Sequence, residues 1–341
     1  MMSAVRIASA ATGIGARLRA ARASRRFRLA VRVLVGVGVL IAVVAQVGTG
    51  PFLHGLLSVD LRVIVAALAL SATATAAAAW RWSIIAKRLG VGLPYPRAVG
   101  MYYRSQLLNT VLPGGVVGDV QRALTQGRDA GDVGQGARAV VIERTVGQVV
   151  QVALAVVVIA CFAAEFQGYL LATTGLVVTV IALATLAMTA TSARARAALR
   201  RELDEISAGV GSARALLQVV VASIVVVACH VVTFGVAVAA VGASVPPMRL
   251  AALALVVLLA GSIPLSLGGW GPREGIAGWA FAVAGLGAST GVAASALFGV
   301  VAMIAVAPGL VLTALSAVGR VRTPAPVRDV VLAGAQRKGE S

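Results

Sequence analysis

The chain has 341 residues, of which 59% are hydrophobic and 12% are charged, and its mean hydropathy is +0.94. A water-soluble globular domain of this length needs more polar surface than this composition supplies, so that class is excluded. The composition instead predicts an all-α polytopic membrane protein that is solvated largely by lipid.

The net charge of +18 raises the question of a nucleic-acid partner. The basic residues are spread over several loops and the tail, without the interleaved aromatic residues that such binding uses. Membrane topology and attraction to anionic headgroups explain the charge better, so we predict no nucleic-acid partner. The two cysteines and two histidines have no metal-ligand spacing, and Cys229 and His230 are predicted to be packing residues. We therefore expect no metal and no cofactor.

Apolar runs of about 20 residues recur along the chain, and each is long enough as a helix to cross a hydrocarbon core about 30 Å thick. About eight crossings are predicted, at 29–48, 61–81, 139–164, 169–191, 215–242, 250–266, 274–288 and 290–316. The seventh is short and rich in glycine. A single integral membrane domain is therefore expected over 29–316, between a basic N-terminal segment, 1–28, and a basic disordered tail, 317–341.

The distribution of lysine and arginine predicts the orientation. Basic residues concentrate before the first predicted crossing, after the second (where Arg81 is counted), between the fourth and fifth, and in the tail. The intervening loops 49–60 and 165–168 carry none, and 243–249 carries only Arg249. The positive-inside rule then places both termini in the cytosol, in agreement with an even number of crossings. We expect the chain in the cytoplasmic membrane of a prokaryote.

A first broken segment interrupts the apolar pattern near 104–124. Pro113 removes a backbone donor, and Gly114 and Gly115 remove the steric bar to irregular torsions, so a helix cannot continue through them. The pattern restarts before Arg122, and a polar stretch then returns the chain to the cytosol, which predicts a re-entrant hairpin. Irregular backbone at membrane depth is tolerated only where protein or a water-filled cavity covers it, so the hairpin is predicted to line a cavity. The positive end of the restarted helix suits a phosphate or carboxylate.

A second broken segment lies near 262–275, where Gly268, Gly269 and Gly271 precede the pair Arg273-Glu274. Pro272 is well placed to start the next helix, with Glu274 near its positive end. A charge at membrane depth costs roughly 2.5 to 3.5 kcal/mol, so it is usually retained for a pathway or binding site. The alternative is a tight cytosolic turn with a surface ion pair.

A third charged pair, Glu143-Arg144, opens the third predicted crossing. Adjacent residues diverge by about 100° on a helix, so at most one of them can face the bundle interior squarely. The other could extend to the headgroups, and a plain interfacial anchor pair is the alternative for both.

Both broken segments follow the second helix of a group of four predicted helices. This suggests a 4+4 parallel internal repeat about an axis along the membrane normal, with both breaks on the cytosolic side.

Three ordered motifs carry a family resemblance: Asn109-x-x-Leu112-Pro113-Gly114-Gly115-x-x-Gly118-Asp119-x-x-Arg122, then Ile142-Glu143-Arg144, then Pro264-x-Ser266-x-Gly268-Gly269-x-Gly271-x-Arg273-Glu274-Gly275. Across roughly 25–320 the chain resembles the lysylphosphatidylglycerol synthase transmembrane-region family, also called the flippase-like domain family. The best-understood relatives, the multiple peptide resistance factors, join this domain to a cytosolic aminoacyltransferase. The short tail after the last predicted helix cannot house a transferase, so we expect a stand-alone member without enzymatic activity.

These patterns and the resemblance together favour a lipid translocase with a polar cavity between the broken segments. The candidate headgroup and cavity residues are Asn109, Pro113, Gly114, Gly115, Gly118, Asp119, Arg122, Glu143, Arg144, Ser266, Gly268, Gly269, Gly271, Arg273 and Glu274. Arg122 and Arg273 are expected to contact a phosphate-bearing or anionic headgroup, with Asp119 and Glu274 orienting them or meeting an amino group. Phospholipids, aminoacyl-phospholipids and polyprenyl-linked lipids all remain open as cargo.

Two alternatives remain open. The first is a non-transporting membrane partner that binds or presents a lipid to a separate glycosyltransferase or synthase. The second is an integral transferase that acts on a lipid carrier, for which the acids Asp119 and Glu274 are the only support.

Overall fold

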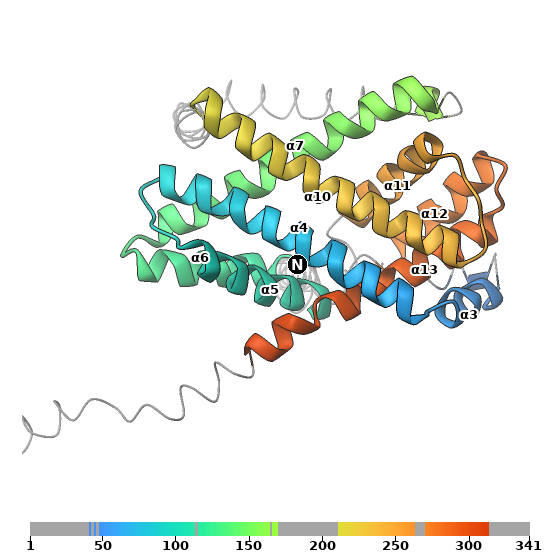
Figure 1. Ribbon diagram of the computed structural model, residues 1–341, viewed down its shortest axis with the longest axis horizontal. Helices are drawn as coiled ribbons and strands as arrows, with labels where there is room; N and C mark the ends of the chain where they lie inside the picture. Colours follow the sequence, from blue (N-terminus) through green and yellow to red (C-terminus); the bar gives the residue numbers. More distant parts are fainter. Residues whose placement is uncertain are drawn as a thin grey trace, which may run out of the picture.

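The computed structural model describes residues 41, 44, 45, 48–112, 115–163, 166–169, 211–262 and 270–313. Within these residues every regular element is a helix (Figure 1). The helices are α3 (Gly50–Leu57), α4 (Leu61–Arg88), α5 (Tyr95–Val111), α6 (Val117–Asp129), α7 (Val133–Phe162), α10 (Ala213–Ala240), α11 (Pro247–Gly261), α12 (Pro272–Val283) and α13 (Ala288–Ala305). The predicted all-α membrane protein is thereby confirmed.

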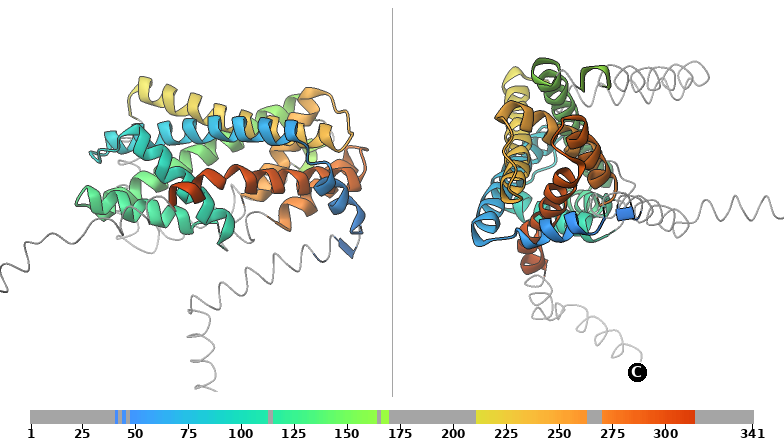
Figure 2. Two further views of the ribbon diagram at one scale, coloured as in Figure 1. Left: turned by 60° about the horizontal axis from the view of Figure 1, so that its bottom comes forward. Right: turned by 90° about the vertical axis from the view of Figure 1, so that its right-hand side faces the viewer.

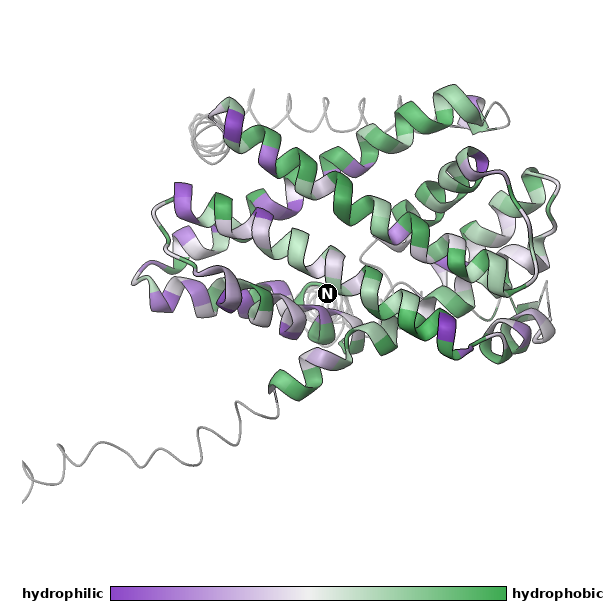
Figure 3. Ribbon diagram, viewed as in Figure 1, coloured by the Kyte–Doolittle hydropathy of each residue, from purple (hydrophilic) through white to green (hydrophobic). Residues whose placement is uncertain are grey.

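Four segments are long and apolar enough to cross a membrane: α4, α7, α10 and Ala288–Thr313, which begins with α13. They run side by side along the long axis of the molecule (Figure 2). Figure 3 shows hydrophobic residues along α7 and α10, whereas hydrophilic ones gather on α5 and α6. The predicted crossings 29–48 and 169–191 lie largely outside the described residues.

The helices α5 and α6 form an antiparallel pair that enters and leaves at one end of the bundle. Arg97, near the start of α5, donates from Nη2 to Oδ2 of Asp129, the last residue of α6, at 2.5 Å. Gly118 lies so close to α5 that a Cβ there would be 2.0 Å from the carbonyl oxygen of Ser105. This is the re-entrant arrangement predicted near 104–124.

The helices α11 and α12 form a second antiparallel pair. Arg249, near the start of α11, donates from Nη2 to the carbonyl oxygen of Ala284, which follows α12, at 2.7 Å. The two helices have 15 and 12 residues, which corresponds to lengths of about 22 Å and about 18 Å. Neither reaches across a core about 30 Å thick. The structure therefore replaces the predicted crossings 250–266 and 274–288 with a second re-entrant pair.

The two re-entrant pairs open at opposite ends of the bundle. At the end that carries Lys87, Arg88 and Arg97, here named the basic end, Arg88 of α4 donates to Ser212, the N-cap residue of α10, at 2.9 Å. The pair α5–α6 follows α4 at the basic end, and the pair α11–α12 follows α10 at the other end (Figure 1). The expectation of a parallel repeat with both breaks on one side is therefore wrong, because α4 and α10 run in opposite directions.

The arrangement is instead an inverted repeat, in which α4 to α7 correspond to α10 to α13. The helices α4 and α10 have 28 residues each, and a glycine with positive φ follows both: Gly90 at 77° and Gly242 at 83°. Proline then forms the N-cap of both short helices, at Pro94 and Pro246. Inverted repeats of this kind are related by a pseudo-two-fold axis in the membrane plane.

The hydrophobic core has two main parts, one toward each end. The cluster near the basic end joins α4, α5, α6 and α7 around Trp82 and Tyr102. The larger cluster joins α10 to α13 with α4 and α7 around Phe234, Phe281 and Leu297. Many of the buried residues are alanines, and small side chains let helix backbones approach closely. A hydrogen bond from Arg81 of α4 to Ser223 of α10 joins the first half to the second.

Candidate functional site

A cavity of about 650 Å³ lies between the two broken segments. One wall includes Gly115 and Val116 before α6, and another includes Gly261 and Ser262 at the end of α11. The full lining is Ala67, Leu70, Ser71, Gln106, Asn109, Thr110, Gly115, Val116, Asp119, Arg144, Thr145, Gln148, His230, Thr233, Gly261, Ser262, Phe298, Val301, Ala302, Ala305 and Val306. Its size is that of a site for a small molecule or a lipid headgroup.

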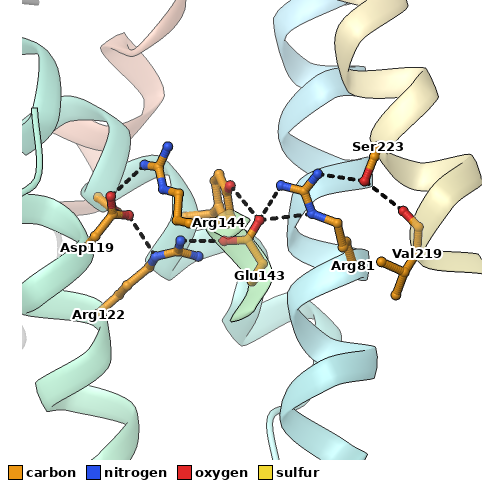
Figure 4. Close-up of polar contacts among 9 residues, drawn as sticks. Arg81, Asp119, Arg122, Glu143, Arg144, Val219 and Ser223 are labelled. Carbon is orange, nitrogen blue, oxygen red and sulfur yellow. Dashed lines mark hydrogen bonds and ion pairs between the residues drawn. The ribbon is translucent and has the colours of Figure 1, made fainter. Parts of the chain in front are cut away.

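A chain of ion pairs lies behind one wall of this cavity (Figure 4). Glu143 of α7 is fully buried between two arginines. Its Oε1 accepts from Nε of Arg81 at 3.0 Å and also from Nη2 of the same guanidinium, and its Oε2 accepts from Nη2 of Arg122 at 2.6 Å. Tyr102 adds a hydroxyl donor to Oε1 at 3.2 Å. The buried carboxylate is thus held by α4, α5 and α6 together.

Asp119 continues the chain of ion pairs toward the cavity. Its Oδ1 accepts from Nε of Arg122 at 3.0 Å, and its Oδ2 accepts from Nη2 of Arg144 at 2.7 Å. Asn109 and Ser105 of α5 also donate to this carboxylate, at 3.3 and 3.2 Å. Asp119 therefore joins the buried Arg122 to the accessible Arg144.

Arg122 and Arg81 are fixed by further contacts. The guanidinium carbon of Arg122 lies 4.7 Å from the ring centroid of Trp82 and 4.5 Å from that of Tyr102, so the cation makes cation–π contacts with both rings. Arg81 donates from Nη1 to Oγ of Ser223 on α10 at 2.9 Å. This last bond links the network of the first half of the repeat to the second half.

The electrostatic balance of this cluster is positive. Three guanidinium groups, those of Arg81, Arg122 and Arg144, face two carboxylates, those of Asp119 and Glu143. The side chains of Arg81 and Arg122 are 6% and 0% exposed, whereas that of Arg144 is 49% exposed. The surplus positive charge is therefore available to a ligand through Arg144.

A second, smaller cluster lies at the start of α12. Arg273 donates from Nη2 to Oε1 of Glu274 at 2.6 Å, and Ser295 of α13 donates to the same oxygen at 3.2 Å. The other oxygen of Glu274 accepts from the backbone N–H of Gly271 at 2.7 Å, which caps the helix. The guanidinium carbon of Arg273 lies 5.4 Å from the ring centroid of Phe298, a residue that lines the cavity. This cluster is electrically neutral and buried behind the cavity wall.

The structure sorts the predicted site residues into three groups. Those that line the cavity are Asn109, Gly115, Asp119 and Arg144. Those that lie behind its walls are Gly118, Arg122, Glu143, Gly271, Arg273 and Glu274. Those that fall outside the described residues are Pro113, Gly114, Ser266, Gly268 and Gly269.

The roles expected for Arg122 and Arg273 do not fit this geometry. Arg122 is 0% exposed and Arg273 is 4% exposed, and buried carboxylates hold both. On α7, Glu143 faces the buried network and its neighbour Arg144 faces the cavity, as the angle between adjacent helical residues requires. The guanidinium that a headgroup can reach is that of Arg144.

Sequence reasoning missed several participants. Arg81 was counted with the loop after the second crossing, but α4 continues to Arg88 and buries Arg81 at Glu143. His230, predicted to be a packing residue, lines the cavity together with Gln148. The apolar residues Ile84 and Ile85 beyond Arg81 were the available signal that the helix continues.

Among the residues that the structure describes, no group of three or more His, Cys, Asp or Glu side chains is placed to bind a metal ion. Cys161 is exposed and Cys229 is buried, and both thiols are free.

Comparison with known proteins identifies the family to which the chain belongs. A search of curated proteins gave no match. Residues 29–309 match a family described as the lysylphosphatidylglycerol synthase TM region. This span covers both re-entrant pairs, the buried network and the cavity. The chain therefore belongs to the lysylphosphatidylglycerol synthase transmembrane-region family.

Proposed function

We propose that this protein is a lipid translocase that moves a phosphate-bearing lipid across the membrane through the central cavity. The membership of the family supports a role in handling lipids. The observation that carries the proposal is the half-exposed guanidinium of Arg144 in a cavity between two helix pairs that open at opposite ends. No covalent step is required of the chain in this scheme.

The charge of the site favours an anionic headgroup. The cluster of Arg81, Arg122 and Arg144 with two carboxylates has one surplus positive charge. A phosphate placed at Arg144 would neutralise that surplus and would accept charge-assisted hydrogen bonds from the guanidinium. The start of α6, beside Val116 in the lining, presents the positive end of a helix to the same space.

The apolar part of the cavity lining suits the rest of a lipid. The part of the lining that comes from α13 and the residue after it is apolar: Phe298, Val301, Ala302, Ala305 and Val306. A headgroup in the polar part could therefore lie beside hydrocarbon chains that remain in an apolar environment.

The inverted repeat supplies a route for movement. In transporters built from inverted repeats, the substrate site lies near the bilayer midplane at the repeat interface, and one repeat rocks against the other. Here Arg81 of the first half bonds to Ser223 of the second, and the cavity is lined by both halves. By the positive-inside rule we place the basic end in the cytosol. The proposed membrane is the cytoplasmic membrane of a prokaryote.

The test measures lipid movement in vesicles made from a bacterial polar lipid extract. A membrane-impermeant phospholipase added outside hydrolyses only outer-leaflet lipid, so hydrolysis beyond the outer-leaflet share reports movement. The wild-type protein is compared with Arg144→Ala and with the matched control Arg128→Ala, an exposed arginine of α6 outside the cavity. We expect Arg144→Ala to slow movement at least tenfold, since a hydrogen bond to a charged group contributes about 1.5 to 3 kcal/mol, and Arg128→Ala to leave it unchanged.

The outcomes separate the candidate functions. Equal movement with wild-type and Arg144→Ala protein would remove Arg144 from the transport site. Lipid binding that depends on Arg144 without any lipid movement would favour the lipid-presenting membrane partner instead.

A further inference from the structure

The carboxylate in the cavity has no free accepting capacity. Among the described residues of the lining, Asp119 is the only acidic one. It accepts four hydrogen bonds, from Ser105, Arg122, Asn109 and Arg144, two at each oxygen. An ionised carboxylate has about four acceptor sites, so all of them are occupied. An ammonium group could bond to this carboxylate only by displacing one of these donors.

The surplus positive charge opposes an ammonium for a second reason. An incoming cation would approach the accessible guanidinium of Arg144, whose carboxylate partner among the described residues, Asp119, is shared with the buried Arg122. Like charges brought together in a site of low dielectric repel one another more strongly than in water. Both observations disfavour a headgroup that carries an amino group.

The rest of the polar lining is uncharged and suited to hydroxyl groups. These side chains are Ser71, Gln106, Thr110, Thr145, Gln148, Thr233 and Ser262, with His230 beside them. Thr145 and Gln148 are exposed, and Gln148 lies one helical turn beyond Arg144 on the same face of α7. A phosphate on Arg144 would therefore place the next group of the lipid beside an amide that can both donate to and accept from hydroxyls.

We infer that the lipid cargo carries a phosphate joined to an uncharged, hydroxyl-bearing group such as glycerol or a sugar, and no ammonium. This inference rests on the proposed function and specifies its substrate class. The inferred cargo differs from the cationic lipid named in the description of the family. A lysyl headgroup would bring amino groups to a cavity whose described lining has no carboxylate free to receive them.

The test compares the binding of two lipids to the purified full-length protein in detergent. With the same acyl chains, phosphatidylglycerol carries an uncharged diol after the phosphate, whereas phosphatidylethanolamine carries an ammonium. We expect phosphatidylglycerol to bind at least tenfold more tightly. Gln148→Leu should weaken the binding of phosphatidylglycerol roughly three- to tenfold and leave that of phosphatidylethanolamine unchanged, since one neutral hydrogen bond is lost.

Matched variants keep the result interpretable. Gln151→Leu removes the same amide from α7 outside the cavity lining and should change nothing, and Thr145→Val provides a second cavity variant if Gln148→Leu does not fold. Equal or tighter binding of phosphatidylethanolamine, or unchanged binding by folded Gln148→Leu and Thr145→Val, would overturn the inference. If Arg144→Ala weakens the binding of neither lipid, the proposed phosphate site is wrong. If it weakens the binding of both lipids equally and the wild-type protein binds the two lipids equally well, only the inferred headgroup class is wrong.

Discussion

Replacing Glu143 with glutamine tests whether the buried ion-pair network holds the two halves of the protein together. The substitution keeps the shape and one acceptor but removes the negative charge between Arg81 and Arg122, whose side chains are 6% and 0% exposed. Removing one partner of a buried ion pair costs about 3 to 5 kcal/mol, because the remaining charges stay buried without compensation. Here Arg122 would keep the carboxylate of Asp119. Among the described residues, Arg81 would keep no carboxylate partner and would be left with uncharged acceptors such as the hydroxyl of Ser223.

The assay is thermal unfolding of the detergent-purified protein. At about 2 to 4 °C per kcal/mol, Glu143→Gln should lower the midpoint by about 6 to 20 °C. The matched control is Asp129→Asn, which breaks the ion pair with Arg97. Those two side chains are 43% and 54% exposed, and such surface pairs contribute about 0 to 1 kcal/mol.

A double variant distinguishes charge burial from a packing defect. Glu143→Leu combined with Arg81→Met removes both partners and should be more stable than Glu143→Leu alone, because no unpaired charge is left at Arg81. A midpoint for Glu143→Gln that matches the one for Asp129→Asn would refute the reasoning, as would a double variant no more stable than the single one.

Three further predictions concern the re-entrant pairs. Gly118→Ala should destabilise the protein and separate α5 from α6, because the added Cβ would lie 2.0 Å from the backbone oxygen of Ser105. In a thermal unfolding assay the control Gly100→Ala should be as stable as the wild type, because a Cβ there has no atom within 4 Å. Arg273→Ala should lower the free energy of unfolding by about 3 to 5 kcal/mol, because it leaves the buried Glu274 without its cationic partner. It should not remove a ligand contact, so lipid affinity per folded molecule should persist. Single cysteines at Gly92 and Ser244, in a background without the native cysteines, should react with an impermeant thiol reagent from opposite sides of the membrane; reaction from one side would contradict the inverted repeat.

The membership of the lysylphosphatidylglycerol synthase TM family agrees with the three motifs that carried the resemblance. Two of these motifs contain the charged residues now placed in one network, through Asp119, Arg122 and Glu143. The third contains Arg273 and Glu274, which form a separate pair behind the opposite wall. Most charged residues of the motifs therefore support the walls of the cavity. Arg144 is the motif residue whose charged side chain is 49% exposed and can be reached by a ligand.

The sequence by itself determined the membrane class, the all-α architecture, the two breaks and most of the charged residues near the cavity. These features are local: hydropathy is read within one helix length, and Pro113 or Gly271 interrupts a helix through its own backbone. The contacts between helices that are far apart in the sequence could not be predicted in this way. Whether 250–266 and 274–288 cross the membrane depends on where α11 and α12 end and on how they pack against their neighbours.

The tertiary structure alone decided the inverted orientation of the two halves and which arginines are buried or exposed. Arg81, Arg122 and Arg144 are equivalent in composition, and only the packing of α4, α6 and α7 buries two of them and leaves the third 49% exposed. The physical reason is that the cost of a buried charge is set by its partners, and those partners come from helices far apart in the chain.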